Sequence, residues 1–325
     1  MIIQENYYAV KAISNTALGY IDFASGGSPR KFKEFMDGTL QEEEAAYRRT
    51  GSLIHLAVLE PEKFKVADIE KPSDAVCGIV ESVFNTVTED QFADVLTLAD
   101  YTDHILSAAN AANYQTNWKD DTRVKKIIEL GSEYFDYLQM VRESEEIVLT
   151  NKEFGVVNAC AASLKTDPHI SKVMFPDNLP EHIEVLREFE IYFDYSGFSC
   201  KAKLDQAVVN HKNKSVMLID LKTTSKGIQD FSESFAKFQY DRQIAFYKLA
   251  LEAKFPGYKL IMAAIAAVET TGYNRARLFV VPDKVIAGGA LKITNCFAII
   301  RDCMETGNWE YEPNYIESPY EIELA

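Results

Sequence analysis

The spacing of apolar residues changes near residue 184 and divides the chain into two parts. Before it, residues 62–145 have mostly helical spacing. From Glu184 the period becomes two, and residues 188–193 and 198–209 alternate like half-buried strands. A helix is predicted at 235–254, because a Pro-Gly pair at 256–257 stops it. Helices and strands that alternate behind a helical first half predict an α/β core wrapped by helices.

One apolar run, residues 216–219, predicts a strand that is buried on both faces. Asp220, Leu221 and Lys222 follow it directly. Charged groups at the end of a core strand cost free energy unless they are paired or used. Because side chains alternate along a strand, Asp220 and Lys222 point the same way, about 6.5–7 Å apart. The pattern predicts either a reactive site or a salt bridge between Lys222 and an aspartate.

The hairpin formed by the strand at 198–209 and the strand at 216–224 places a second acid beside Asp220. A turn centred between Lys212 and Asn213 pairs residues whose numbers sum to about 425, so Asp205 lies opposite Asp220. Their Cβ atoms are then about 4.5–5.5 Å apart, which is destabilising unless a cation lies between them. Carboxylates are preferred ligands of hard cations such as Mg²⁺ and Mn²⁺.

A metal at this position has the chemistry to lower the pKa of a bound water and to neutralise a phosphate. Lys222 is suited to orient or deprotonate that water, or to stabilise the transition state. The next residues, Thr223, Thr224, Ser225 and Lys226, offer hydroxyls and a cation to a phosphate backbone.

His55 is a further candidate, on a predicted helix that ends before Pro61. Gly51 precedes it by four residues and therefore lies on the same helix face, where its missing side chain is predicted to leave space beside the imidazole.

Composition excludes several other classes of function. The formal net charge of −15 argues against a generic nucleic-acid-binding surface. The five cysteines are odd in number, widely spaced and without a C-x-x-C pair, which argues against a zinc ribbon, an iron–sulfur cluster and a disulfide framework. No segment approaches the ~20 apolar residues of a membrane span. The N-terminus lacks the pattern of a signal peptide, so we expect a cytoplasmic protein without membrane partners.

Several segments resemble, in chain order, the motifs of RecE-like (exonuclease VIII-like) phage and prophage exonucleases of the PD-(D/E)XK superfamily. The matching segments are 13–18 with 28–29 for the N-terminal segment, 51–55 for the G-x-x-x-H helix, Asp205 with 220–222 for D…(D/E)-x-K, and 240–247 for Q-x-x-x-Y. The resemblance covers most of the chain and is weakest over residues 62–150.

The resemblance implies one PD-(D/E)XK nuclease domain over residues 1–325, with a central mixed β-sheet flanked by helices and a largely helical N-terminal half. It implies N-terminal helices with the histidine motif at 1–61, a mostly helical insertion at 62–183, a catalytic α/β core at 184–282, and a C-terminal helix and tail at 283–325.

The same resemblance implies a metal site. His55, Asp205 and Asp220, with the backbone carbonyl of Leu221, would bind one or two Mg²⁺ or Mn²⁺ ions.

It also implies roles around the catalytic lysine, Lys222. Gln243 would position the lysine, the water or the nucleic-acid backbone, and Tyr247 would support Gln243. Glu188 corresponds to an acidic position of the family, and Glu190, on the same strand face, is the alternative.

For function, the resemblance implies digestion of one strand of linear duplex DNA from a 5′ end in a bacterial or phage-infected cell. The resulting 3′ overhangs would pass to a single-strand annealing recombinase. A homo-oligomeric ring is expected, with a basic channel inside an acidic exterior. An endonuclease, or a flap or single-strand nuclease, is one alternative. A non-catalytic DNA-binding module is another, against which the complete set of site residues argues.

Overall fold

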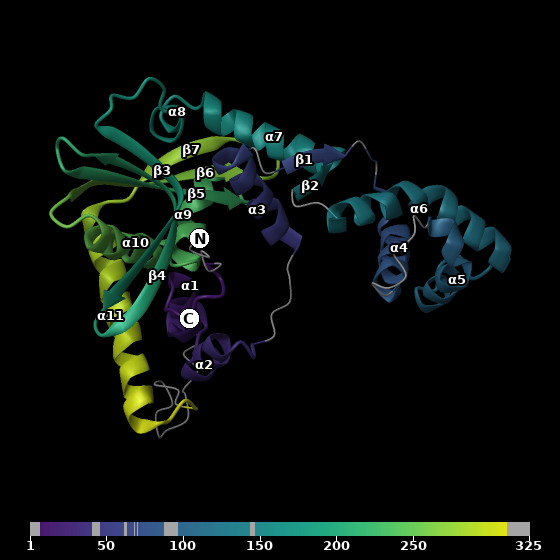
Figure 1. The fold of residues 1–325 in the computed structure, drawn as a ribbon, viewed down its shortest axis with the longest axis horizontal. Coiled ribbons are helices and arrows are strands. Elements are labelled where there is room, and N and C mark those ends of the chain that lie inside the picture. The colour runs from purple at the N-terminus through teal and green to yellow at the C-terminus, as the bar shows by residue number, and fades with distance from the viewer. Residues whose placement is uncertain are drawn as a thin grey trace, which may run out of the picture. The chain divides into compact units, whose positions relative to one another are not determined.

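A computed structural model describes residues 7–40, 46–61, 64–67, 69, 71–87, 97–143 and 147–310 (Figure 1). The chain forms two compact units, one of residues 1–51 with 160–325 and one of residues 52–159. Helix α3 (Ala46–Leu59) runs from the first unit into the second.

A five-stranded sheet forms the centre of the first unit. Its strands lie in chain order: β3 (Ile183–Tyr195), β4 (Phe198–Asn210), β5 (Ser215–Thr224), β6 (Lys259–Glu269) and β7 (Ala276–Val280). Neighbours are antiparallel except β5 and β6, which are parallel. The sheet is therefore mixed, as expected. Its one parallel step needs a crossover, and the helices between β5 and β6 provide it.

Helices build the core of this unit against the sheet. They are α1 (Asn15–Ile21), α2 (Pro29–Asp37), α9 (Phe231–Lys237), α10 (Tyr240–Lys254) and α11 (Asp283–Thr306), with short 3-10 turns at Phe23–Ser25 and Ile228–Asp230. Leu18, Phe246 and Phe297 pack in one apolar cluster with residues of β4, β5 and β6. The strand β5 is buried along most of its length, which confirms the prediction from its apolar run.

Helices α7 (Asn151–Thr166) and α8 (Ile170–Met174) precede β3. From α8, the carbonyl oxygens of Val173 and Met174 accept hydrogen bonds from Gln206 and Arg187 on the sheet.

The second unit has its own apolar core. Its helices are α4 (Asp74–Thr86), α5 (Thr102–Ala111) and α6 (Asp120–Glu143), with a 3-10 turn at Leu98–Tyr101. Ile79, Ile105 and Phe135 are fully buried among them. Strands β1 (Phe64–Ala67) and β2 (Ile147–Thr150) form a parallel pair. This unit overlaps most of the segment 62–183 that the family resemblance assigns to an insertion.

Negative charge is concentrated outside the sheet-bearing part of the chain. Residues 52–159 contain 20 Asp and Glu residues against 9 Lys and Arg residues. Residues 160–310 contain 18 Asp and Glu residues against 19 Lys and Arg residues. Most of the net charge of −15 therefore lies in residues 52–159, and the whole unit that carries the sheet has 29 acidic against 25 basic residues.

One predicted helix is wrong. Residues 235–254 form α9 and α10 rather than one helix, because Gln239 adopts a left-handed conformation with φ of 54°. Lys292 of α11 holds Gln239 there, with its Nζ 2.5 Å from the side-chain oxygen. The predicted C-terminal tail from residue 311 lies outside the described residues. No helix in the described part of the chain is long and apolar enough to cross a membrane.

Candidate active site

The site begins where the pairing of β4 with β5 ends. The paired residues run from Asn210 with Ser215 to Gln206 with Ile219, which confirms the predicted register. Asp205 and Asp220 occupy the next position of this register. There the ladder is replaced by a side-chain bond, because the Leu221 N–H donates to Asp205 Oδ2 at 2.6 Å.

Asp220 and Lys222 form the ion pair that the sequence offered as an alternative. Asp220 is 1% exposed, and Lys222 Nζ lies 2.5 Å from its Oδ2. The ammonium is also 3.4 Å from the Leu221 carbonyl oxygen and 5.2 Å from the centre of the Tyr240 ring. Burial lowers the pKa of Lys222, but the carboxylates of Asp220 and Asp205 outweigh it and leave that pKa raised.

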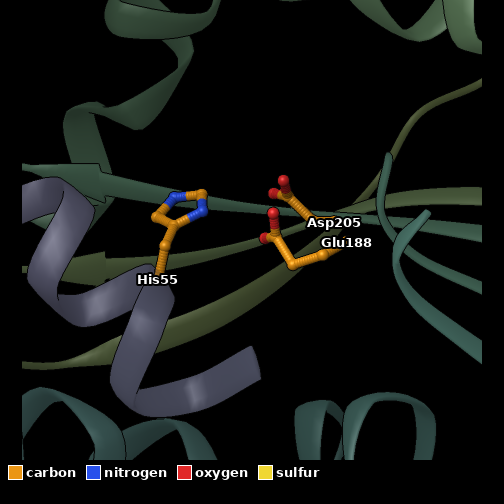
Figure 2. A group of neighbouring side chains, drawn as sticks. All are labelled: His55, Glu188 and Asp205. Carbon is orange, nitrogen blue, oxygen red and sulfur yellow. The ribbon is translucent and has the colours of Figure 1, made fainter. Parts of the chain in front are cut away.

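A second group of candidate ligands surrounds Asp205. One nitrogen of His55 and one carboxylate oxygen each of Glu188 and Asp205 lie within 4.8 Å of one another, and all three residues are half-buried. Figure 2 shows the two carboxylates side by side beside the imidazole ring. An imidazole and two carboxylates at this spacing fit a divalent cation such as Mn²⁺ or Mg²⁺. Asp220, a predicted ligand, is not in this group of three but next to it in the β4–β5 register.

Glu188 reaches this group because the regular alternation of β3 breaks there. It has a φ of 47°, and it lies between the pairs Arg187 with Gln206 and Phe189 with Leu204 without a ladder pair of its own. Such a conformation is unfavourable for a residue with a side chain and is common at functional sites. Glu190, the alternative, instead accepts a hydrogen bond from the Tyr192 hydroxyl at 3.2 Å.

In the neighbouring strand β4, the alternation of side chains between the two sheet faces is also interrupted, opposite Glu188. Leu204 and Ala207 both belong to the main apolar core although they are three positions apart. In a regular strand they would point to opposite faces. The interruption falls on Asp205, so the two acids lie at a common irregularity of neighbouring strands.

Burial raises the pKa of Asp205 to about 6. Lys222 and the Leu221 N–H oppose the rise, and Glu188 adds to it. A cation that binds here therefore competes with a proton for the Asp205 carboxylate near neutral pH.

Gln243 and Tyr247 lie together on α10, as their spacing predicted. Gln243 Nε2 donates to the Tyr247 hydroxyl at 2.8 Å. Burial raises the pKa of Tyr247 far above its ordinary value, and the nearby charges of Asp220 and Asp205 add to this. The pair is thus electrostatically coupled to both aspartates, with the tyrosine as a neutral hydroxyl.

The prediction about Gly51 is wrong in its detail. A Cβ at Gly51 would lie 3.0 Å from Thr223 Oγ1, so the missing side chain lets α3 approach β5 and does not clear space for the imidazole of His55.

The predicted phosphate-binding residues are partly engaged in local structure. Thr224 is buried, and its hydroxyl accepts the Lys226 N–H at 3.1 Å. Lys226 Nζ pairs with Glu233 at 2.7 Å. The Ser225 carbonyl accepts a hydrogen bond from the Thr271 hydroxyl.

Sequence reasoning missed residues that support the site from the side. Lys203 Nζ lies 2.7 Å from Glu188. Arg242 is buried and bonds Asp22, Ser25 and Asn15, which ties α10 to α1. Lys203 was visible as an alternating position of its strand, whereas nothing in the local pattern marked the partners of Arg242.

The arrangement is that of an α/β nuclease core, with acids and a lysine on adjacent central strands, β4 and β5, where their pairing ends. Residues 19–318 match the model of a family described as a PDDEXK-like domain of unknown function (DUF3799). The chain belongs to this family of PDDEXK-like domains. Nucleases of the PD-(D/E)XK class use divalent metal ions, to which the donor set of His55, Glu188 and Asp205 is suited.

Solved structures give weaker likenesses. The "putative exonuclease" of Eubacterium rectale is 13% identical with a TM-score of 0.49, over 100% of this chain and 96% of its own. The protein SSO0001 is 9% identical with a TM-score of 0.22, and the match covers 75% of this chain and 85% of SSO0001. No curated protein matches this chain.

Proposed function

We propose that this protein is a metal-dependent DNA exonuclease of the RecE-like type. It would hydrolyse one strand of linear duplex DNA in the 5′ to 3′ direction and leave 3′ overhangs. One observation carries the proposal: Asp205, Asp220 and Lys222 converge where the pairing of β4 with β5 ends, with two further metal-ligand groups beside Asp205. Membership of the PDDEXK-like family supports the same chemistry.

His55, Glu188 and Asp205 would hold the Mg²⁺ or Mn²⁺ ion, with Asp220 and the Leu221 carbonyl adjacent for a shared or second ion. Such an ion supplies an activated water and neutralises phosphate charge.

Lys222 would act as a cation and not as a base. Its raised pKa keeps the ammonium protonated at neutral pH. From beside Asp220 it would stabilise the negative charge that develops on the phosphate oxygens. Gln243, bonded to Tyr247, would orient the scissile phosphate or the water.

We further propose that the overhang is passed to a single-strand annealing recombinase, and that the chain works as a homo-oligomeric ring in the cytoplasm. The near-balance of charge in residues 160–310 is compatible with DNA binding by this part of the chain.

The test is digestion of linear and covalently closed circular duplexes of one sequence, each in Mg²⁺ and in EDTA. We expect loss of the linear duplex in Mg²⁺ only, with a label at the 5′ end released before a label at the 3′ end of the same strand. Cutting of closed circles would instead favour an endonuclease. Binding without cleavage of either would favour a non-catalytic module.

A further inference from the structure

Three tyrosines form an aromatic group at the surface of the first unit. Tyr8 is 77% exposed and Tyr192 is 48% exposed. The ring of Tyr7 lies between them, 5.4 Å from Tyr8 and 6.2 Å from Tyr192 between ring centres. We call Tyr7, Tyr8 and Tyr192 the tyrosine cluster.

The cluster continues the strand that carries Glu188. Glu190 and Tyr192 follow at alternate positions of β3, opposite Lys203 and Lys201 of β4. Two residues of a strand span about 6.6 Å, so Tyr192 lies about 13 Å along the strand from Glu188. The ion pair of Lys203 with Glu188 joins this row to the candidate metal group. A few nucleotides of single strand cover that distance.

A buried charge fixes the segment that carries two of the tyrosines. Lys201 is 8% exposed, and its Nζ donates to the carbonyl oxygens of Tyr7 at 2.8 Å and Val10 at 2.7 Å. The same ammonium lies 4.7 Å from the centre of the Tyr7 ring. Ile13 then pairs with Cys200 at the edge of β4. The segment is therefore held against the sheet before the first helix begins.

We propose that the tyrosine cluster is a stacking platform for the unpaired bases of the DNA strand that occupies the active site. The proposal rests on the proposed nuclease function and names the form of its substrate next to the site: single-stranded, with bases turned toward the protein.

Two features select bases over other occupants. Glu190 lies between the metal group and the cluster, and its carboxylate disfavours a phosphate backbone at that point. Aromatic faces bind every base, because each base has a π-face, and such stacking does not depend on sequence. A closed duplex offers no exposed base face except at its end.

Binding is measured with the full-length Lys222→Ala variant in Mg²⁺, so that cleavage does not interfere. The ligands are a fluorescent (dT)12 and an abasic deoxyribose-phosphate chain of the same length. We expect (dT)12 to bind at least about 10-fold more tightly than the abasic chain. Tyr8→Ala with Tyr192→Ala should remove that difference and leave the abasic affinity unchanged, whereas Tyr8→Phe with Tyr192→Phe should keep it.

Tyr273, 87% exposed in the turn between β6 and β7 beside the opposite edge of the sheet, is the matched control. Tyr273→Ala should leave both affinities unchanged. Equal binding of the two ligands by the Lys222→Ala chain would overturn the platform, as would an unchanged preference in the double alanine variant or an equal loss in Tyr273→Ala. Cleavage is scored separately on linear duplex with the unsubstituted chain. A base-dependent affinity without any cleavage would refute the nuclease and retain the platform.

Discussion

At the residue scale, the site depends on charges held close together in a dry environment. Asp220 and Lys222 are an ion pair within the buried strand β5, and Asp205 accepts a hydrogen bond from a backbone N–H in place of a ladder bond. The spacing of Asp220 and Lys222 follows from strand geometry and could be read from the sequence. The choice of Glu188 over Glu190 could not, because it depends on one left-handed backbone conformation in β3.

The first prediction concerns Lys222. Lys222→Met should lower the rate of DNA cleavage at least about 100-fold, because the transition state loses a positioned cation. DNA affinity, measured by anisotropy, should change little. Lys248, a half-exposed lysine on α10 that pairs with Glu252, provides the control, and Lys248→Met should cleave normally. Equal rates in the two variants would remove Lys222 from the mechanism.

The second prediction concerns the pH dependence of stability. The pKa of Asp205 is about 6 in the folded protein, against about 3.9 when unfolded. The folded state therefore binds a proton on Asp205 more strongly than the unfolded state does. Protonation of Asp205 stabilises the fold fully below pH 4, and this stabilisation is lost as the pH rises through 6. In EDTA, the chain should lose about 2 kcal/mol of unfolding free energy between pH 4 and 7, relative to Asp205→Asn. Urea unfolding of both chains at both pH values measures this difference. The same change in unfolding free energy with pH in the unsubstituted chain and in Asp205→Asn would contradict the burial of the carboxyl. Mg²⁺ affinity should rise over the same pH range.

At the scale of elements, α10 is positioned by contacts on both sides. Lys292 Nζ of α11 bonds Asp241 at 2.6 Å, and Arg242 bonds residues of α1 and the turn after it. Between α10 and α11 the backbones nearly touch at Gly289, where a Cβ would lie 2.1 Å from the Asp241 carbonyl oxygen. These contacts fix the position of α10, whose first residue, Tyr240, places the centre of its ring 5.2 Å from the Lys222 ammonium.

The third prediction tests this anchoring. Gly289→Ala should push α11 from α10, destabilise the fold by about 1–3 kcal/mol and lower kcat. Gly288→Ala, its neighbour, meets no atom within 4 Å. That control should gain up to about 1 kcal/mol from helix propensity and keep its activity. Thermal unfolding and cleavage rates separate the two variants; similar behaviour would mean that the close approach is unimportant.

At the scale of the whole molecule, two compact units differ in charge and in architecture. The unit with the sheet carries the acids, the lysine and the tyrosine cluster, and its main segment is close to neutral. The second unit holds most of the excess negative charge around a separate helical core.

The fourth prediction follows from the separate cores. Phe135→Ala removes a fully buried ring of the second unit and should destabilise that unit by about 3–5 kcal/mol. Phe297→Ala should act in the same way on the first unit. Calorimetry with limited proteolysis should show that each variant lowers a different unfolding transition. A single shared transition would show that the units unfold as one.

The sequence by itself determined the strands β3, β4 and β5, the register of the β4–β5 hairpin and the spacing of Asp220, Lys222, Gln243 and Tyr247 on their elements. These features depend on local periodicity and turn length, which a short stretch of chain specifies. Only the tertiary structure decided the break at Gln239, the contact of Gly51 with Thr223 and the place of Glu188 beside Asp205. Each of these places a backbone in a strained or crowded position, and contacts from residues distant in the chain must offset that cost.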